Sequence, residues 1–182
     1  MRHAFAVVLK DEFHGLPILA PPVMAHDAIA EIRRQLVQGR LDTLSLIEGL
    51  GEHEAQWRPR SDAWSIKDHV AHLTAVEEAV LAFAWRMLTE QHPVADSYDV
   101  DAWNARQREQ RADLTWQETL AELAAARDRL LDLLGQVPEK ALMRTGSHPI
   151  WGEPITLASL LRVPYRHERG HRDEIEVLRN PP

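Results

Sequence analysis

The sequence His167-Glu168-Arg169-Gly170-His171, near the end of a chain of 182 residues, decides what the rest of the fold has to supply. Two histidines four residues apart on an α-helix lie one above the other on the same face. With this spacing, one helix can offer two ligands to a single divalent metal ion. Two ligands do not complete a site, so a third ligand has to come from another helix that packs beside this one.

A third histidine is available in residues 64–73, Trp-Ser-Ile-Lys-Asp-His-Val-Ala-His-Leu. Ser65 and Asp68 have the spacing of a capping box, in which each side chain satisfies the other's free backbone N–H, so we expect a helix to begin at Ser65. His69 and His72 both fall at the edge of the apolar stripe of this helix, with His69 slightly closer to its centre. Helical spacing alone leaves the choice between them open.

Apolar side chains recur at a helical period in four regions of the chain. They predict helices over about residues 27–50, 65–92, 99–135 and 156–179, and a second capping box at Thr115 and Glu118 predicts a break in the third near Leu114. Residues 51–63 and 137–154 are expected to be loops, and Pro164 is expected to kink the last helix just before the histidine pair. Four amphipathic helices with little strand signal favour an all-α protein, a four-helix bundle.

Residues 1–23 form an N-terminal extension to the predicted bundle domain, residues 24–182. Phe5, Val7 and Leu9 alternate as in a short strand, and the prolines that follow, Pro17, Pro21 and Pro22, exclude a continuous helix. We expect this arm to pack on the surface of the domain or on a partner subunit.

The composition is that of a globular protein with one substantial core, 45% hydrophobic and 27% charged. A formal net charge of −7 with no basic cluster argues against nucleic acid as a partner. The absence of cysteine excludes disulfides, thiolate metal ligands and cysteine nucleophiles. No apolar run approaches the roughly 20 residues that cross a bilayer. We therefore expect a cytoplasmic protein that does not act on membranes.

Residues 167–171 also match the His-Glu-x-x-His signature of zinc peptidases, in which the glutamate is the general base. A peptidase is not expected, because only residues 172–182 follow and they contain no further histidine or recognisable ligand motif. A di-iron carboxylate site needs two Glu-x-x-His motifs, and only Glu168 to His171 provides one. Inward-facing histidines can also be hydrogen-bonded core residues, and the residues alone leave a metal site and a plain core equally open.

Four motifs occur in order along the chain: Arg58-Pro59, Trp64-Ser65-Ile66, His72-Leu73 and the closing His167-x-x-x-His171. In this combination the chain resembles the DinB/YfiT-like superfamily of four-helix proteins over about residues 25–180. The resemblance implies a metal triad of His72, His167 and His171, and so favours His72 over His69. It further implies a divalent ion, most often zinc or nickel, and a homodimer. Residues 1–23 are an addition to the family pattern.

The resemblance implies a metal-dependent enzyme but does not identify its reaction. Three neutral imidazoles leave an open position on the ion for water or a thiolate, and the ion lowers the pKa of what it binds. We therefore expect a small-molecule substrate, with either hydrolysis or transfer dependent on a low-molecular-weight thiol. The alternative is a non-catalytic stress-response or binding module on the same bundle. That alternative predicts a triad that is buried, metal-free or closed by a fourth protein ligand.

Other side chains are candidates for supporting roles near the triad. Glu168 is the first candidate for a catalytic base or for a partner of a ligand N–H, although it could equally be solvated or paired with Arg169 or Arg172. Glu77 could orient a histidine or pair with an arginine. Trp64 is expected in the core. The weaker candidates for a pocket wall are Trp103, Asn104, His148 and Trp151.

Overall fold

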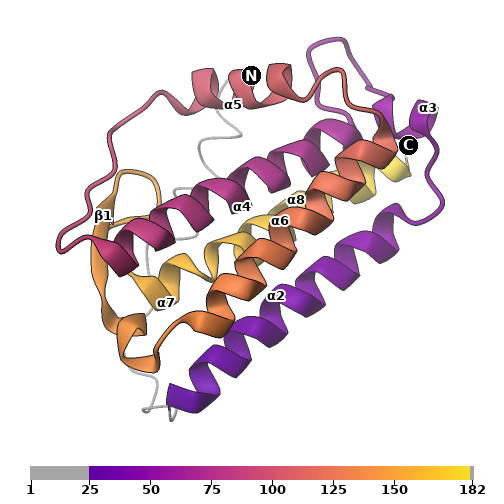
Figure 1. The fold of residues 1–182 in the computed structure, drawn as a ribbon. Helices are drawn as coiled ribbons and strands as arrows, with labels where there is room; N and C mark the ends of the chain where they lie inside the picture. Colours follow the sequence, from indigo (N-terminus) through magenta and orange to yellow (C-terminus); the bar gives the residue numbers. More distant parts are fainter. Residues whose placement is uncertain (1–24, 181–182) are drawn as a thin grey trace.

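The computed structural model describes residues 25–180, which fold mainly into helices (Figure 1). The four long helices are α2 (Ala25–Ile47), α4 (Ile66–Thr89), α6 (Trp116–Gln136) and α8 (Val163–Arg179). The short elements are α3 (Glu52–Gln56), α5 (Val100–Gln110), the 3-10 helix η1 (Glu139–Met143) and α7 (Leu157–Leu160). The predicted four-helix bundle is confirmed. The predicted arm, with its short strand, lies outside the described residues.

The long helices are not arranged around the bundle in the order of the chain. α2 packs against α8 and α6, and α4 packs against α6 and α8. The first and second long helices are therefore diagonal to each other, as Figure 1 shows with α6 and α8 between them. This order could not be predicted from the sequence, because the connections between the helices are long enough to allow several arrangements.

The start of α4 is fixed by the predicted capping box. The Asp68 backbone N–H donates to Ser65 Oγ at 3.1 Å, and the Ser65 backbone N–H donates to Asp68 Oδ2 at 2.8 Å. Arg58 adds an ion pair with Asp68 at 2.9 Å. These contacts set the register of α4, and they therefore set the direction in which His72 points.

The second predicted capping box is also found, whereas α2 and α4 each end three residues before their predicted ends. Thr115 and Glu118 form the second capping box. The Glu118 backbone N–H donates to Thr115 Oγ1 at 3.2 Å, and the Thr115 backbone N–H donates to Glu118 Oε2 at 2.7 Å. α2 ends at Ile47, two residues before Gly49, whose φ of 78° is a conformation that glycine adopts easily.

Two predicted loops contain regular structure, which corrects the sequence prediction. Residues 51–63 include α3, and residues 137–154 include η1 and most of an antiparallel hairpin of β1 (Thr145–His148) and β2 (Gly152–Thr156). A Cβ added at Gly146 would lie 3.0 Å from Phe83 Cζ, so the hairpin packs tightly on α4. Tertiary packing forms these short polar strands, which have little intrinsic strand preference.

The predicted single helix over residues 156–179 is wrong. The segment is divided into α7 and α8, which are separated at Leu161 and Arg162. Pro164 lies in the first turn of α8. A proline at this position removes no helical hydrogen bond, because the first N–H groups of a helix have no partner within it. Pro164 therefore helps to begin α8 instead of kinking a longer helix.

The core is divided into two apolar parts by a polar layer. The larger part includes Ile32, Leu36, Val80 and Leu130, and the smaller part includes Ile47, Val70, Leu123 and Ile175. Each of the four long helices contributes one buried charged residue between these parts: Arg40, Glu77, Arg127 and Glu168. None of the helices within residues 25–180 combines the length and the apolar character needed to cross a membrane.

Candidate metal centre

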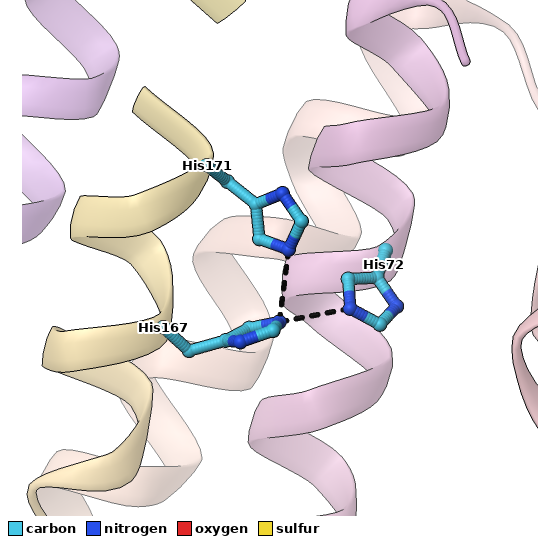
Figure 2. Close-up of side chains that lie close together, drawn as sticks. All are labelled: His72, His167 and His171. Carbon is cyan, nitrogen blue, oxygen red and sulfur yellow. Dashed lines mark hydrogen bonds between the residues drawn. The ribbon is translucent and has the colours of Figure 1, made fainter. Parts of the chain in front are cut away.

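Three histidine side chains converge between α4 and α8 (Figure 2). His167 and His171 come from successive turns of α8, and His72 faces them from α4. His167 Nε2 lies 2.8 Å from His72 Nε2 and 3.0 Å from His171 Nε2. All three side chains are buried. The structure therefore brings together the triad that the sequence motifs indicated.

The three ring nitrogens cannot satisfy one another by hydrogen bonding. A neutral imidazole nitrogen carries either one proton or one lone pair, so His167 Nε2 can bond to only one of its two neighbours. A cation between them would accept one lone pair from each ring. Tetrahedral coordination with metal–nitrogen distances of about 2.0–2.1 Å places ligand nitrogens about 3.3 Å apart. The two spacings of 2.8 and 3.0 Å are within about 0.5 Å of that value, so the donor set fits a divalent metal ion.

Burial keeps two of the three histidines in the form that a metal requires. It lowers the pKa of His72 and of His167 well below that of an exposed histidine, and a charge on His171 would lower both further. These rings are therefore neutral at pH 7 and can offer a lone pair. Metal binding does not have to displace a proton from either of them.

Glu174 fixes the orientation of His171. Its Oε2 lies 2.6 Å from His171 Nδ1, so the Nδ1–H donates to the carboxylate and Nε2 is left unprotonated toward the other rings. Burial raises the pKa of Glu174, but the hydrogen bond with His171 counts among the effects that outweigh this and lower the pKa overall. An ionised Glu174 therefore selects the tautomer of His171 that suits a ligand.

His69 lies behind His171 and not among the three converging nitrogens. Its Nδ1 is 3.1 Å from His171 Nδ1 and 3.5 Å from Glu174 Oε2. His69, His171 and Glu174 therefore make a second close group on the other side of the shared ring. Burial lowers the pKa of His69 to about 4, so this ring is also neutral at pH 7. The geometry separates His69 from His72, which helical spacing could not do.

Two tryptophans form the wall of the centre on the side of α5. The Trp64 ring is 5.1 Å from the His72 ring, and it lies nearly parallel to the His171 ring at 6.2 Å. The Trp103 ring is 6.0 Å from that of His72. Trp64 is only partly buried and lines the site, so its prediction as a plain core residue is wrong.

His148 and Trp151 are not part of this wall. They stack on each other at 3.9 Å, and His148 packs against Phe83, near the other end of α4. The backbone N–H groups of Ile150 and Trp151 donate to His148 Nδ1, so this histidine stabilises the turn of the hairpin. Their prediction as pocket residues is not supported by the structure.

Glu168 is ion-paired and cannot serve as a free base in this arrangement, which corrects the first of its two predicted roles. Arg40 Nε donates to one carboxylate oxygen at 2.7 Å, and Arg127 Nη2 donates to the other at 2.8 Å. Burial raises the pKa of Glu168, but the two guanidinium groups outweigh this and lower it overall. The ion-paired alternative holds, although the partners are not Arg169 and Arg172.

Glu77 completes a buried network of two arginines and two carboxylates. Its Oε1 accepts from Arg40 at 2.6 Å and also from Arg127. Of the two roles predicted for Glu77, the structure shows pairing with arginine. The network joins all four long helices and has no net charge. It therefore fixes the segment of α8 that carries His167 and His171 in relation to α4.

Comparison with protein families assigns the chain to a superfamily. The family model described as the DinB superfamily matches residues 35–175. The chain belongs to the DinB superfamily. No curated protein sequence matches it significantly.

Solved structures show that this member of the DinB superfamily has relatives of the same fold. YfiT from Bacillus subtilis, described as a probable metal-dependent hydrolase with an unusual four-helix bundle topology, is 22% identical with a TM-score of 0.69 over 91% of both chains. A protein from Streptococcus pneumoniae is 13% identical with a TM-score of 0.63, over 87% of this chain and 91% of its own. One from Escherichia coli UTI89 is 14% identical with a TM-score of 0.61, over 80% and 91%.

Proposed function

We propose that this DinB-superfamily protein is a metal-dependent enzyme whose reactive centre is a divalent ion, zinc or nickel, held by His72, His167 and His171. The observation that carries the proposal is the convergence of three Nε2 atoms that cannot satisfy one another. The description of YfiT as a probable metal-dependent hydrolase supports the same class of function.

The proposed site has an open position. The group around His167 Nε2 contains three ligand residues, and within residues 25–180 no carboxylate or fourth histidine is close to all three. A three-histidine ion keeps a fourth position for water or a thiolate and lowers the pKa of that ligand. The absence of a fourth protein ligand among these residues favours an enzyme, whereas the burial of all three rings is a feature that the non-catalytic module predicts.

The surrounding residues support the ligands and take no covalent part. Glu174 holds His171 in the required tautomer, and the network of Arg40, Glu77, Arg127 and Glu168 holds α8 in place. Trp64 and Trp103 shield the rings from bulk water, which strengthens electrostatic interactions at the centre. We propose two reactions for such a site: hydrolysis of a small molecule, or transfer that uses a low-molecular-weight thiol.

The binding partner and the assembly of the whole protein are also proposed. A small molecule is the proposed partner of the site, and a homodimer is the proposed assembly. Light scattering on the eluate of a size-exclusion column measures the mass directly. A mass of one chain, 20.8 kDa, at micromolar concentration would contradict the dimer.

Elemental analysis of protein purified without a His-tag, paired with activity assays, tests the proposed function. We expect about one zinc or nickel ion per chain, and turnover either of a simple ester or amide, or of an electrophile with bacillithiol, mycothiol or glutathione. His72→Ala should lose both the metal and the activity. His92→Ala, which removes an exposed histidine outside the centre, is the matched control. A metal-loaded protein that turns over none of these substrates would favour the non-catalytic alternative.

A further inference from the structure

Two adjoining cavities lie along the face of α5 that packs on the beginning of α4. The larger has a volume of about 590 Å³ and the smaller about 200 Å³, and both are lined by Ala105 and Arg108. Figure 1 shows α5 lying beside α4 on the side of the bundle away from α2. The volume of the larger cavity is within the usual range for small-molecule sites, about 300–1,000 Å³.

These cavities lie next to the histidine centre. Trp64 lines the smaller cavity and packs against the rings of His72 and His171. Asp68 lines the larger cavity and precedes His72 by one turn of α4, on the same face. A molecule bound along α5 would therefore be held beside the rings that we propose as metal ligands.

The larger cavity is rich in cations although the chain has a net charge of −7. Four cationic residues line it with two acidic ones, Asp68 and Glu109. Three of the cations are already held by protein groups: Arg58 by Asp68, Lys67 by the carbonyls of Ala112 and Leu114, and Arg111 by Glu78 and Glu122. The fourth cation is Arg108.

Arg108 is partly buried, and it has no hydrogen bond or ion pair from its side chain to any other residue that the structure describes. Asn104 lies one turn earlier on the same face of α5 and lines the smaller cavity. The amide oxygen of Asn104 is buried without a hydrogen-bond partner. Buried polar groups normally have partners, so the Asn104 oxygen is suited to accept a hydrogen bond from a bound molecule. Arg108 is the one cation lining the larger cavity that no protein group among the described residues holds.

Burial of apolar surface does not explain the sequence of α5. The helix has no fully buried residue, and it packs on the bundle mainly through α4. The smaller cavity is lined by four residues of α5 that have the spacing of a single helix face: Asp101, Asn104, Ala105 and Arg108. Apart from Trp103, which packs on His72, the part of α5 that faces the protein is therefore largely a polar surface over a cavity.

We propose that the substrate of the histidine centre carries an anionic oxygen group, a carboxylate or a phosphate, that is bound by Arg108. The planar guanidinium group binds two oxygens of either anion through parallel hydrogen bonds. Asn104 accepts a hydrogen bond from an N–H or O–H group of the same molecule. This inference rests on the proposed function, because it takes the metal centre as the reactive group.

Thiol binding to the cobalt-loaded protein tests the inference without requiring turnover. The probes are 3-mercaptopropionate and 6-mercaptohexanoate, each compared with the uncharged mercaptoalcohol of the same length, and binding is followed by thiolate-to-cobalt absorption. We expect the carboxylate to bind about tenfold more tightly than the alcohol for at least one length, since hydrogen bonds to charged groups are worth that much. Arg108→Gln should remove this preference. Arg106→Gln, an exposed arginine on the same helix that lines neither cavity, should retain it.

The metal-free protein separates this inference from the proposed function. Titration with acetate or inorganic phosphate should shift the Arg108 Nε resonance whether or not the protein binds a metal, and the larger shift identifies the preferred anion. Failure to bind cobalt would refute the metal centre alone. Equal affinity for carboxylate and alcohol, or an Arg108 resonance that neither anion shifts, would overturn the assignment of Arg108.

Discussion

Replacement of Glu168 by glutamine distinguishes a structural carboxylate from a catalytic base. The change keeps the size of the side chain but removes its charge, and Arg40 and Arg127 then share only the carboxylate of Glu77. Glu168 is 1% exposed, so water cannot replace the lost partner. Loss of one member of a buried ion pair costs about 3–5 kcal/mol. This is a large part of the roughly 5–15 kcal/mol that stabilises a typical domain.

Urea unfolding of the metal-free protein, followed by circular dichroism, measures this cost. We expect Glu168→Gln to lower the free energy of unfolding by about 3–5 kcal/mol. Glu176→Gln, an exposed glutamate on the same helix, should change it by less than about 0.5 kcal/mol. If Glu168→Gln lost activity but kept the stability of the control, Glu168 would act as a base and the structural role would be wrong.

Three further predictions follow from the site and from the start of α4. The metal-free protein should lose stability as the pH falls from about 6.5 toward 4, because the unfolded chain takes up protons at His69, His72 and His167 that the folded protein binds only at lower pH. Each histidine lowers the free energy of unfolding by up to about 1.4 kcal/mol per pH unit. A urea midpoint that is equal at pH 5 and pH 7 would contradict this. Glu174→Gln should weaken zinc binding about 10- to 100-fold in competition with a chelator, and unchanged affinity would show that His171 needs no such partner. Ser65→Ala should lower the free energy of unfolding by about 1 kcal/mol, and a loss below about 0.3 kcal/mol would mean that the cap does not hold α4.

Local patterns predicted the features that local chemistry determines. The capping boxes at Ser65 and Thr115 mark where α4 and α6 begin, because each depends on two residues three apart in the chain. His167 and His171 share a face of α8 for a similar reason. The choice of His72 over His69 needed the family motif, because both histidines lie at the edge of the apolar stripe of α4.

Features that depend on tertiary packing were missed. The hairpin forms on α4 with little strand preference of its own, and the diagonal placement of α2 and α4 depends on contacts between distant segments. Glu174 lies three residues after His171 on the same helix, so the pair could be read from spacing. The role of Glu174 in selecting the tautomer of His171 could not be predicted, because it depends on the placement of the other two rings.

The arginines of the charged network left a signal in the sequence, beside the expected pairing of Glu77 with an arginine. Arg40 lies between Leu36 and Ile47 in the buried stripe of α2, and Arg127 lies between Leu123 and Leu130 in that of α6. Glu77 and Glu168 occupy corresponding inward positions on α4 and α8. An arginine at a core position has to be paired. Two such arginines and two such glutamates, one on each long helix, predict a buried neutral network.

Calorimetric titration of the metal-stripped, tag-free protein with zinc tests the central claim most directly. We predict one tight site per chain that is lost in His72→Ala, His167→Ala and His171→Ala, and kept in His92→Ala. If the unmodified protein binds no zinc or nickel, or if it still binds one ion tightly after one of the three histidines is removed, the three-histidine centre is wrong.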